Sequence, residues 1–378
     1  MFPESKAAMD TSLLEKGSGY KQVGDKSYCI LRDYESVLNT THNYTKTYTI
    51  REHGEVWLEG AEEADARPTD YTVPDFSTGE LFKDDKPAGN IFLYTGSNAG
   101  ELKVVRNMRI WSTYSDDDGE TWSKPVDLTP MIKEDWMLFC GTGPGVGIQV
   151  KKGEHAGRLI VPIYVANQNW TSAQAATSIY SDDYGVTWQR TQMSPLEAAG
   201  TDLSTMNNGG AILTESQIVE MNDGTLIQFC RNVSGSLKYS ISTDSGTTWG
   251  EPVRDTGVPE VYCQLTATHY PEKIDGKEAI ILANPNGPAR NNGMARIGLY
   301  NPEDKTFEWK YSQLVKSGSY AYSCLSILPD RNIGLFYEGD NQTMEYTSFN
   351  VEWIKADLTV PMKEPVIENV AMEKSDNQ

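Results

Sequence analysis

Short apolar segments alternate with turn-forming residues along most of the chain. Residues 158–165, 225–230, 278–283 and 332–338 are mainly apolar, and each follows closely on a glycine or an aspartate. No segment keeps a helical period of hydrophobic positions over ten or more residues. The 32 Gly, 18 Pro, 20 Tyr and 9 Trp also favour turns and strands over helices. The pattern therefore predicts an all-β protein.

Three eight-residue segments share the pattern S-x-D-x-G-x-T-W and begin 66 and 61 residues apart. Serine and aspartate side chains accept backbone N–H bonds across a tight turn, and glycine supplies a positive φ. The tryptophan is expected to return along the next strand and to pack under the turn. Each segment thus predicts a hairpin. The shared positions are Ser115, Asp117, Gly119 and Trp122; Ser181, Asp183, Gly185 and Trp188; and Ser242, Asp244, Gly246 and Trp249.

The spacing of these hairpins predicts the architecture. One hairpin in every sixty-odd residues leaves room for two further strands, which makes a four-stranded sheet per repeat. Four-stranded sheets repeated around an axis form a β-propeller. Residues 11–89 lack the turn pattern and are dense in Tyr and Thr. We interpret that segment as an inserted, irregular β subdomain and not as a blade.

Composition excludes several classes of function. Lys and Arg number 33 against 53 Asp and Glu, so the net charge is −20, which argues against a nucleic-acid partner. No apolar run is long enough to span a membrane, and the N-terminus has no secretory signal pattern. We expect no cofactor and no metal, because the four histidines and five cysteines are scattered. The cysteines are expected to be buried free thiols.

The three turn segments resemble the Asp-boxes of sialidases (neuraminidases), and the resemblance extends over most of the chain. Residues 143–148, 157–162, 214–220, 284–288 and 321–325 resemble segments of bacterial exo-sialidases in order and spacing. The resemblance implies a six-bladed propeller that releases terminal α-linked sialic acid from glycans or glycoproteins. It also implies a retaining reaction with a tyrosine nucleophile and a secreted or cell-surface parent protein.

The resemblance also assigns site residues one by one. Glu215, in Thr-Glu-Ser-Gln, matches the partner of the nucleophile, and Tyr322, in Tyr-Ala-Tyr-Ser-Cys-Leu, matches the nucleophile itself. Arg231 and Arg290 match the second and third of three arginines that hold the substrate carboxylate. Planar guanidinium groups suit this task because they bind a carboxylate bidentately and stay charged. A neutral phenol approaches an anionic substrate without like-charge repulsion, and its pKa of about 10 requires a base such as Glu215.

Two of these assignments have a competitor nearby in the sequence. Arg296 lies close to Arg290 and could be confused with it. Tyr320 precedes Tyr322 by two residues and would share its face if both lay on a strand. The Ser-Cys-Leu that follows Tyr322 favours Tyr322 as the nucleophile.

The chain departs from the family pattern near its beginning. The first arginine of the family lies in an Arg-Ile-Pro segment, which occurs nowhere here, and the acid/base aspartate follows that segment. We therefore expect an N-terminally truncated form that lacks most of the first blade. In this interpretation residues 1–10 are a remnant of the first or second blade region, 11–89 the inserted subdomain, 90–360 the propeller blades and 361–378 a tail.

Two alternative functions remain open. The chain could be a non-catalytic propeller that binds sialylated glycans, since Asp-boxes also occur outside sialidases. The full-length parent could also be an intramolecular trans-sialidase. Transfer enzymes of this family resemble one another in a tryptophan about twenty residues after the nucleophile. Thr343 and its neighbours contain no tryptophan, which favours hydrolysis.

Overall fold

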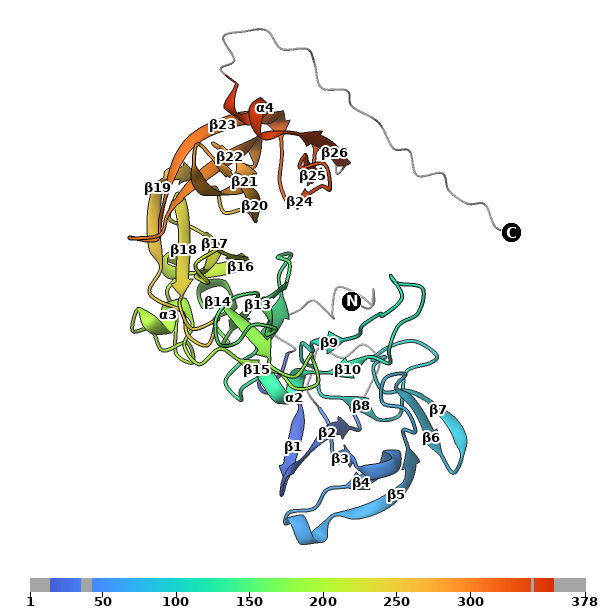
Figure 1. Cartoon of the computed structure of the whole chain (residues 1–378). Helices are drawn as coiled ribbons and strands as arrows, with labels where there is room; N and C mark the ends of the chain where they lie inside the picture. Colours follow the sequence, from blue (N-terminus) through green and yellow to red (C-terminus); the bar gives the residue numbers. More distant parts are fainter. Residues whose placement is uncertain (1–13, 35–42, 341–342, 357–378) are drawn as a thin grey trace, which may run out of the picture. The chain divides into compact units, whose positions relative to one another are not determined.

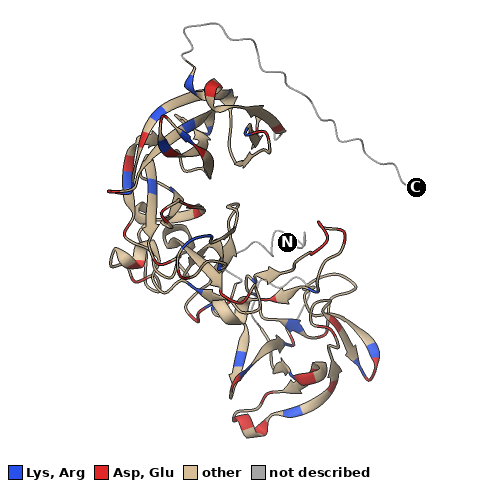
Figure 2. Ribbon diagram, in the orientation of Figure 1, with Lys and Arg blue, Asp and Glu red and all other residues tan. Residues whose placement is uncertain are grey.

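The computed structural model describes residues 14–34, 43–340 and 343–356, which form two compact units (Figure 1). The N-terminal unit comprises the described residues up to 141 together with 165–170, and the propeller unit comprises 142–164 and the described residues from 171 onward. Acidic and basic residues are dispersed over the ribbons of both units (Figure 2). Within the described ranges, no helix has the length and apolar character needed to cross a membrane. The predicted segments 1–10 and 361–378 lie outside the described residues.

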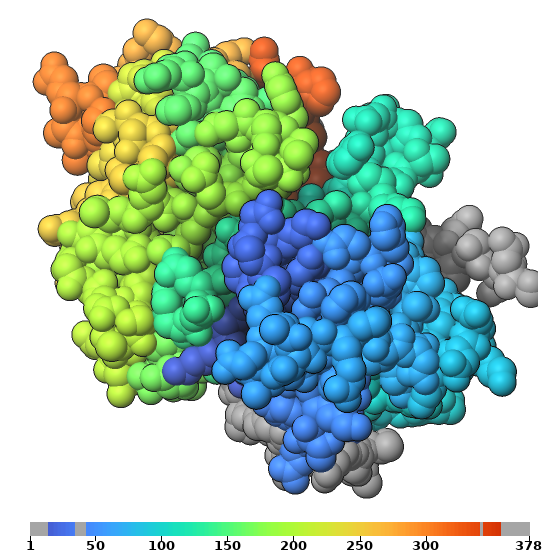
Figure 3. Space-filling view, turned by 90° about the horizontal axis from the view of Figure 1, so that it is seen from below, coloured from blue at the N-terminus to red at the C-terminus, as the bar shows by residue number. Residues whose placement is uncertain are grey.

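The N-terminal unit is built on one antiparallel sheet of eight strands, in the order β1 to β7 with β8 paired to β2. Its core includes Leu31, Val56, Leu81 and Ile91, none more than 1% exposed. Figure 3 shows the blue to cyan residues of this unit packed into one continuous mass. A separate inserted subdomain over 11–89 stays a prediction. The elements are β1 (Tyr20–Val23), β2 (Lys26–Arg32), β3 (Thr47–Ile50), η2 (Glu52–Gly54), β4 (Glu55–Leu58), η3 (Glu63–Asp65), β5 (Arg67–Thr72), β6 (Glu80–Lys83), β7 (Lys86–Asn90) and β8 (Lys103–Val104).

A short hairpin follows the large sheet. Its strands β9 (Trp111–Ser112) and β10 (Val126–Asp127) pair antiparallel and enclose the first of the three repeated turns. The hairpin is succeeded by α2 (Thr129–Ile132) and β11 (Phe139–Thr142), at whose end the chain enters the propeller unit.

The propeller unit contains four antiparallel sheets in a propeller-like arrangement, so the predicted all-β fold is confirmed. The four apolar segments singled out in the sequence each contribute a strand, namely β13, β17, β21 and β25. The first sheet has five strands, in which β11 and β12 (Ile148–Gln149) both pair with β13 (Leu159–Ala166), followed by β14 (Gln174–Ser181) and β15 (Gln189–Arg190). The second is β16 (Leu213–Glu220), β17 (Leu226–Asn232), β18 (Ser236–Ser242) and β19 (Val253–Pro259). The third is β20 (Thr266–Ile274), β21 (Lys277–Pro285), β22 (Asn291–Asn301) and β23 (Thr306–Ser319), and the fourth is β24 (Ser323–Ile327), β25 (Ile333–Glu338) and β26 (Met344–Phe349).

Helical segments in and around the blades are short, as the absence of a long helical period predicts. They are η4 (Trp170–Ser172), α3 (Pro195–Ala198), η5 (Gly209–Ala211) and α4 (Val351–Lys355).

Apolar side chains fill the space between consecutive sheets. One buried cluster joins the first and second sheets, a second joins the second and third, and a third joins the third and fourth together with α4. Polar bonds add to this packing. The Gln264 amide nitrogen donates to the Ser323 carbonyl at 3.0 Å, and Leu325 N donates to Thr266 Oγ1 at 3.2 Å. These bonds hold the start of β24 beside β20, which is important for the site described below.

The three repeated turns have the same hydrogen bonds, and each joins two paired antiparallel strands as predicted. The serine hydroxyl accepts from the glycine N–H, and the aspartate carboxylate accepts from the threonine N–H, while the glycine has φ of 79–91°. The distances are 2.8 Å for Gly119–Ser115 and Thr121–Asp117, 2.8 Å for Gly185–Ser181 and Thr187–Asp183, and 2.9 Å for Gly246–Ser242 and Thr248–Asp244.

The tryptophans of the turns differ in burial. Trp249 is 1% exposed and donates from Nε1 to Ser178 Oγ at 3.0 Å, and Trp188 is 9% exposed. Trp122 is 63% exposed, although its Nε1 donates to the Gly119 carbonyl at 3.2 Å, so its ring lies against its own turn as expected. The other face of the ring is exposed, since the sheet described here has only the two strands β9 and β10.

Candidate active site

Two of the predicted site residues lie side by side on one hairpin of the second sheet. Strands β16 and β17 pair Leu213 with Asn232 and Ser216 with Cys230, and the register shifts between these pairs. Glu215 lies in the bulge, opposite Arg231 near the end of β17. A β-bulge re-aims a side chain that regular pairing would send along the sheet face. The bulge therefore explains how the Glu215 and Arg231 side chains meet.

Tyr322 completes a closed triangle of hydrogen bonds with these two residues. Its phenol Oη donates to Glu215 Oε1 at 2.6 Å. Arg231 Nη1 donates to the other carboxylate oxygen of Glu215 at 2.7 Å and to Tyr322 Oη at 2.8 Å. The Arg231 and Glu215 side chains are 11% and 13% exposed. The structure thus brings together a phenol, a carboxylate and a guanidinium from three strand ends.

The electrostatics of the triangle hold the phenol proton in place in the free protein. Partial burial raises the pKa of Tyr322 to about 12, and the hydrogen bond and charge of Glu215 act in the same direction. Arg231 and Arg290 oppose this change, because each stabilises a phenolate. Burial disfavours the charge of Arg231, yet Glu215 raises the pKa of Arg231 overall. A phenol that donates to a carboxylate, with a cation beside both, has the geometry that a nucleophile and a general base require.

Arg290 lies in the loop between β21 and β22, with its guanidinium carbon 5.4 Å from the centre of the Tyr322 ring. Its Nη2 donates to the Tyr262 carbonyl at 3.2 Å. The competitor Arg296 is 4% exposed and is held by the side-chain oxygens of Asn284 and Asn286. Arg290 is therefore the arginine of this pair that faces the triangle.

The structure also separates the two competing tyrosines. Tyr320 is fully buried, stacks on Tyr337 at 5.0 Å and covers Gly293, where an added Cβ would lie 2.1 Å from the Tyr320 ring. Tyr322 instead points to Glu215. The premise that both lie on one strand is wrong, because β23 ends at Ser319 and β24 begins at Ser323. The irregular backbone between these strands lets the two rings point in different directions.

A glycine-rich run lies against the strand that carries Glu215. A Cβ on Gly145 would lie 1.9 Å from the Ser216 carbonyl oxygen, and one on Gly143 would lie 3.4 Å from Glu215 Cα. Real Cβ atoms do not approach a backbone oxygen to 1.9 Å. Position 145 therefore requires glycine, so that the backbone of this run can pack directly on β16.

Two residues near the triangle have no signal in the sequence. Tyr262 has φ of 57° and places its ring 3.9 Å from the guanidinium carbon of Arg231. Glu260 is 4% exposed, and burial raises the pKa of its carboxyl to about 7. Both lie in the turn between β19 and β20. An acidic residue in a turn is ordinarily exposed, so sequence alone gave no reason to place Glu260 beside Arg231.

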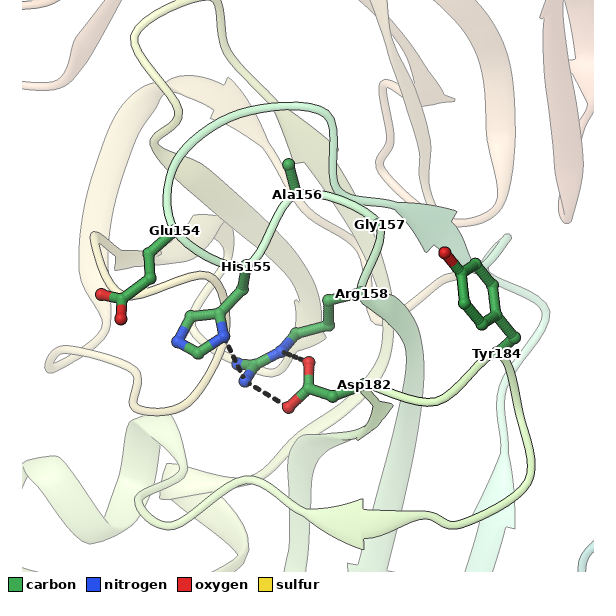
Figure 4. A pocket seen from close by; sticks show the side chains of 7 residues that line it. All are labelled: Glu154, His155, Ala156, Gly157, Arg158, Asp182 and Tyr184. Carbon is green, nitrogen blue, oxygen red and sulfur yellow. Dashed lines mark hydrogen bonds and ion pairs between the residues drawn. The ribbon is translucent and has the colours of Figure 1, made fainter.

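The polar cavity in Figure 4 lies elsewhere, beside the second repeated turn, and has a volume of about 280 Å³. Arg158 lines it between His155 and Asp182, and its guanidinium hydrogen-bonds to Asp182 at 2.7 and 2.8 Å and to His155 Nδ1 at 3.1 Å. Its Nη1 donates to the Ser245 carbonyl and to Thr247 Oγ1. These bonds connect Arg158 to the second repeated turn through Asp182 and to the third through Ser245 and Thr247. We therefore interpret Arg158 as a residue that holds these two turns together.

Neither a metal cluster nor a disulfide is present in the described residues. No three His, Cys, Asp or Glu side chains there are placed to hold a metal ion. All five cysteines are free, and four of them are buried. Cys324 is exposed, so the expectation of burial is wrong for it. It lies on β24, a strand whose second and fourth residues face outward.

The four sheets, the repeated turns and the triangle at the strand ends define a β-propeller of BNR-type repeats. The model of the BNR repeat-like domain family matches residues 47–337. The chain belongs to this family and, within it, to the bacterial-type sialidases, which confirms the resemblance found in the sequence.

Three relatives illustrate the similarity. The anhydrosialidase of Macrobdella decora is 34% identical over 368 residues, which cover 88% of this chain and 44% of the relative. Sialidase B of Streptococcus pneumoniae is 31% identical, with coverage of 84% and 42%. The structure of the intramolecular trans-sialidase from Ruminococcus gnavus in complex with oseltamivir carboxylate aligns with a TM-score of 0.75 and 32% identity, covering 92% of this chain and 73% of that one. The chain spans less than half the length of the two curated relatives.

Proposed function

We propose that the chain is the greater part of the catalytic propeller of an exo-α-sialidase, which hydrolyses terminal sialic acid from glycoconjugates. The observation that carries the proposal is the triangle of Tyr322, Glu215 and Arg231. A tyrosine that is hydrogen-bonded to a carboxylate and flanked by arginines suits a substrate whose reacting carbon carries a carboxylate. Membership of the sialidase family supports the same conclusion.

The proposed reaction proceeds through a covalent intermediate. Tyr322 Oη attacks the anomeric carbon while its proton passes to Glu215, and the bond from that carbon to the leaving oxygen breaks. The leaving oxygen takes a proton from a general acid. Water then attacks the anomeric carbon and gives one proton to the conjugate base of the general acid, the bond to Tyr322 breaks, and the phenolate recovers its proton from Glu215. Two inversions retain the configuration, and Arg231 and Arg290 hold the substrate carboxylate throughout.

The general acid and a third arginine are absent from the described triangle. We propose that both belong to a first blade outside these 378 residues, which would complete a six-bladed propeller. The support is the lack of an Arg-Ile-Pro segment in the chain. General acid catalysis contributes about 10²–10⁴-fold. The parent protein would be secreted or cell-surface and would act on sialylated glycans or glycoproteins.

Intramolecular transfer is the second candidate, because relatives of this chain are named anhydrosialidase and intramolecular trans-sialidase. The sequence after Tyr322 favours hydrolysis. Its single tryptophan, Trp353, lies in α4 and packs on Phe349 at 4.9 Å. The Thr343 hydroxyl donates to the Asp340 carbonyl at 2.7 Å, so this position offers a small polar side chain and no aromatic surface.

A fluorogenic α-sialoside tests the proposal. We define the extended chain as this chain preceded by the proposed first blade. We expect the extended chain to release the fluorophore, Tyr322→Phe to abolish release, and the matched control Tyr320→Phe to retain it. NMR of the sugar product separates free sialic acid from a 2,7-anhydro sugar. Binding of sialylated glycans without release, by a folded extended chain, would instead establish the non-catalytic propeller.

A further inference from the structure

The turn between β19 and β20 is closed by a buried carboxylate. Glu260 Oε1 accepts from Cys263 N at 2.8 Å, within the same turn. Its Oε2 accepts from Asn232 N at 3.3 Å, on β17. Asn232 directly follows Arg231, so this one side chain ties the turn to the backbone that carries an arginine of the site. A buried carboxylate that accepts only backbone N–H bonds is a structural clamp.

The same turn contacts both arginines through Tyr262. The Tyr262 ring lies 3.9 Å from the guanidinium carbon of Arg231, and its carbonyl accepts from Arg290 Nη2 at 3.2 Å. Tyr262 has φ of 57°, a left-handed backbone conformation that a bulky residue adopts only at an energetic cost. Such a conformation persists when surrounding contacts enforce it. The bond from Cys263 N to Glu260 is a contact of this kind, because it spans Tyr262.

We propose that Glu260 is a positioning residue for binding of the sialic acid carboxylate. Its ionised side chain holds the 260–263 turn against β17 and so sets the separation of Arg231 and Arg290. The inference rests on the proposed function, because those two arginines are its carboxylate-binding residues. Glu260 itself does not touch the substrate in this account.

The environment of Glu260 makes this clamp sensitive to pH. Burial raises the pKa of Glu260 to about 7, although the N–H groups of Cys263, Tyr262 and Asn232 and the charge of Arg231 oppose the shift. The ionisable groups around Glu260 are Arg231 from β17 and Tyr262 and Cys263 of its own turn, and the charges of Arg290 and Glu215 also act on Cys263. Below pH 7 the carboxyl gains a proton and loses acceptor capacity toward the N–H groups. Substrate affinity should therefore rise as pH increases through 7.

The first test measures binding of the 2,3-unsaturated analogue of sialic acid to the extended chain between pH 5.5 and 8.5. We expect affinity to increase about ten-fold across this range, which is the size of one lost charge-assisted hydrogen bond. Glu260→Gln should bind the analogue at every pH with the low affinity that the wild type shows at pH 5.5. In turnover assays KM should rise while kcat changes less than about three-fold.

Glu220→Gln is the matched control. The Glu220 carboxylate also accepts backbone N–H bonds, from Lys151 and Lys152 at 2.9 Å, at the far end of β16 from Glu215. This variant should follow the wild-type pH profile. If Glu260→Gln shows the wild-type profile as well, the inference is refuted and the proposed function stands. If the wild type binds no analogue at any pH, the proposed function fails and the inference fails with it.

A second measurement needs no variant and so does not depend on whether Glu260→Gln folds. Hydrogen exchange on the wild type should show that protection factors of Asn232 N–H and Cys263 N–H fall as pH decreases below 7. Protection of the Lys151 N–H should not follow this change. Constant protection of all three amides would overturn the clamp.

Discussion

Replacement of Glu215 by glutamine tests the chemistry of the triangle with a minimal change in shape. The amide keeps an oxygen to accept from Tyr322 but loses the charge and the ability to take up a proton. It also presents an NH2 group either to Arg231, where two donors would face each other, or to Tyr322, whose oxygen already accepts from Arg231. The variant therefore removes a base and leaves the backbone of the bulge intact.

The structure predicts that Glu215→Gln makes Tyr322 easier to ionise and yet lowers the rate of turnover. The pKa of Tyr322 is about 12, and after burial the main causes are the hydrogen bond and the charge of Glu215. Without them, Arg231 and Arg290 should lower the Tyr322 pKa toward its ordinary value near 10. The phenol becomes easier to ionise, yet turnover should fall about 10²–10⁴-fold because no group accepts the proton during attack.

Ultraviolet titration of this chain measures the pKa of Tyr322. The signal of Tyr322 is the difference between each protein and the same protein with Tyr322→Phe. Release of a fluorophore from an α-sialoside by the extended chain measures the loss of turnover. Glu197→Gln is the control, since Glu197 pairs with Arg190 at 3.1 Å in a different part of the unit. A Glu215→Gln protein that retains more than about a third of wild-type turnover, or whose Tyr322 pKa increases, would refute the reasoning.

Three further predictions concern the arginines, the glycine run and the turns. Arg290→Lys should raise KM about ten-fold with little change in thermal stability, because an ammonium cannot bind a carboxylate bidentately; unchanged KM would exclude Arg290 from binding. Gly145→Ala should lower kcat on the order of 10²-fold, since its Cβ would displace the Ser216 carbonyl; normal turnover would show that β16 tolerates the shift. Trp249→Ala should reduce the free energy of unfolding by about 3–5 kcal/mol and Trp122→Ala by about 0.5 kcal/mol; equal losses in denaturant titrations would contradict the difference in burial.

The repeated turns could be predicted from sequence because their bonds are local. Serine, aspartate, glycine and threonine within eight residues contain all the donors and acceptors of the turn. The burial of each tryptophan depends on strands that are distant in the sequence. Trp249 is buried under a full blade and Trp122 is not, although both follow the same pattern.

The candidate site likewise combines residues that are close in the sequence with residues that are distant from them. Glu215 and Arg231 are 16 residues apart on one hairpin, whereas Tyr322 lies 91 residues beyond Arg231 and joins them through the arrangement of the blades. The sequence suggested all three through resemblance and not through spacing. Glu260 and Tyr262 were missed because neither burial of a turn carboxylate nor a left-handed tyrosine has a sequence pattern.

The central claim is that Tyr322 forms the bond to the anomeric carbon. A 2,3-difluoro sialic acid tests it directly, because fluoride departs without a proton donor and the fluorine at C3 slows release of the intermediate. Mass spectrometry of this chain after incubation should find the fluorosialyl group on the peptide that contains Tyr322, and Tyr322→Phe should remain unlabelled. A label on another residue, or an unmodified Tyr322 in an extended chain that turns over α-sialosides, would contradict the account.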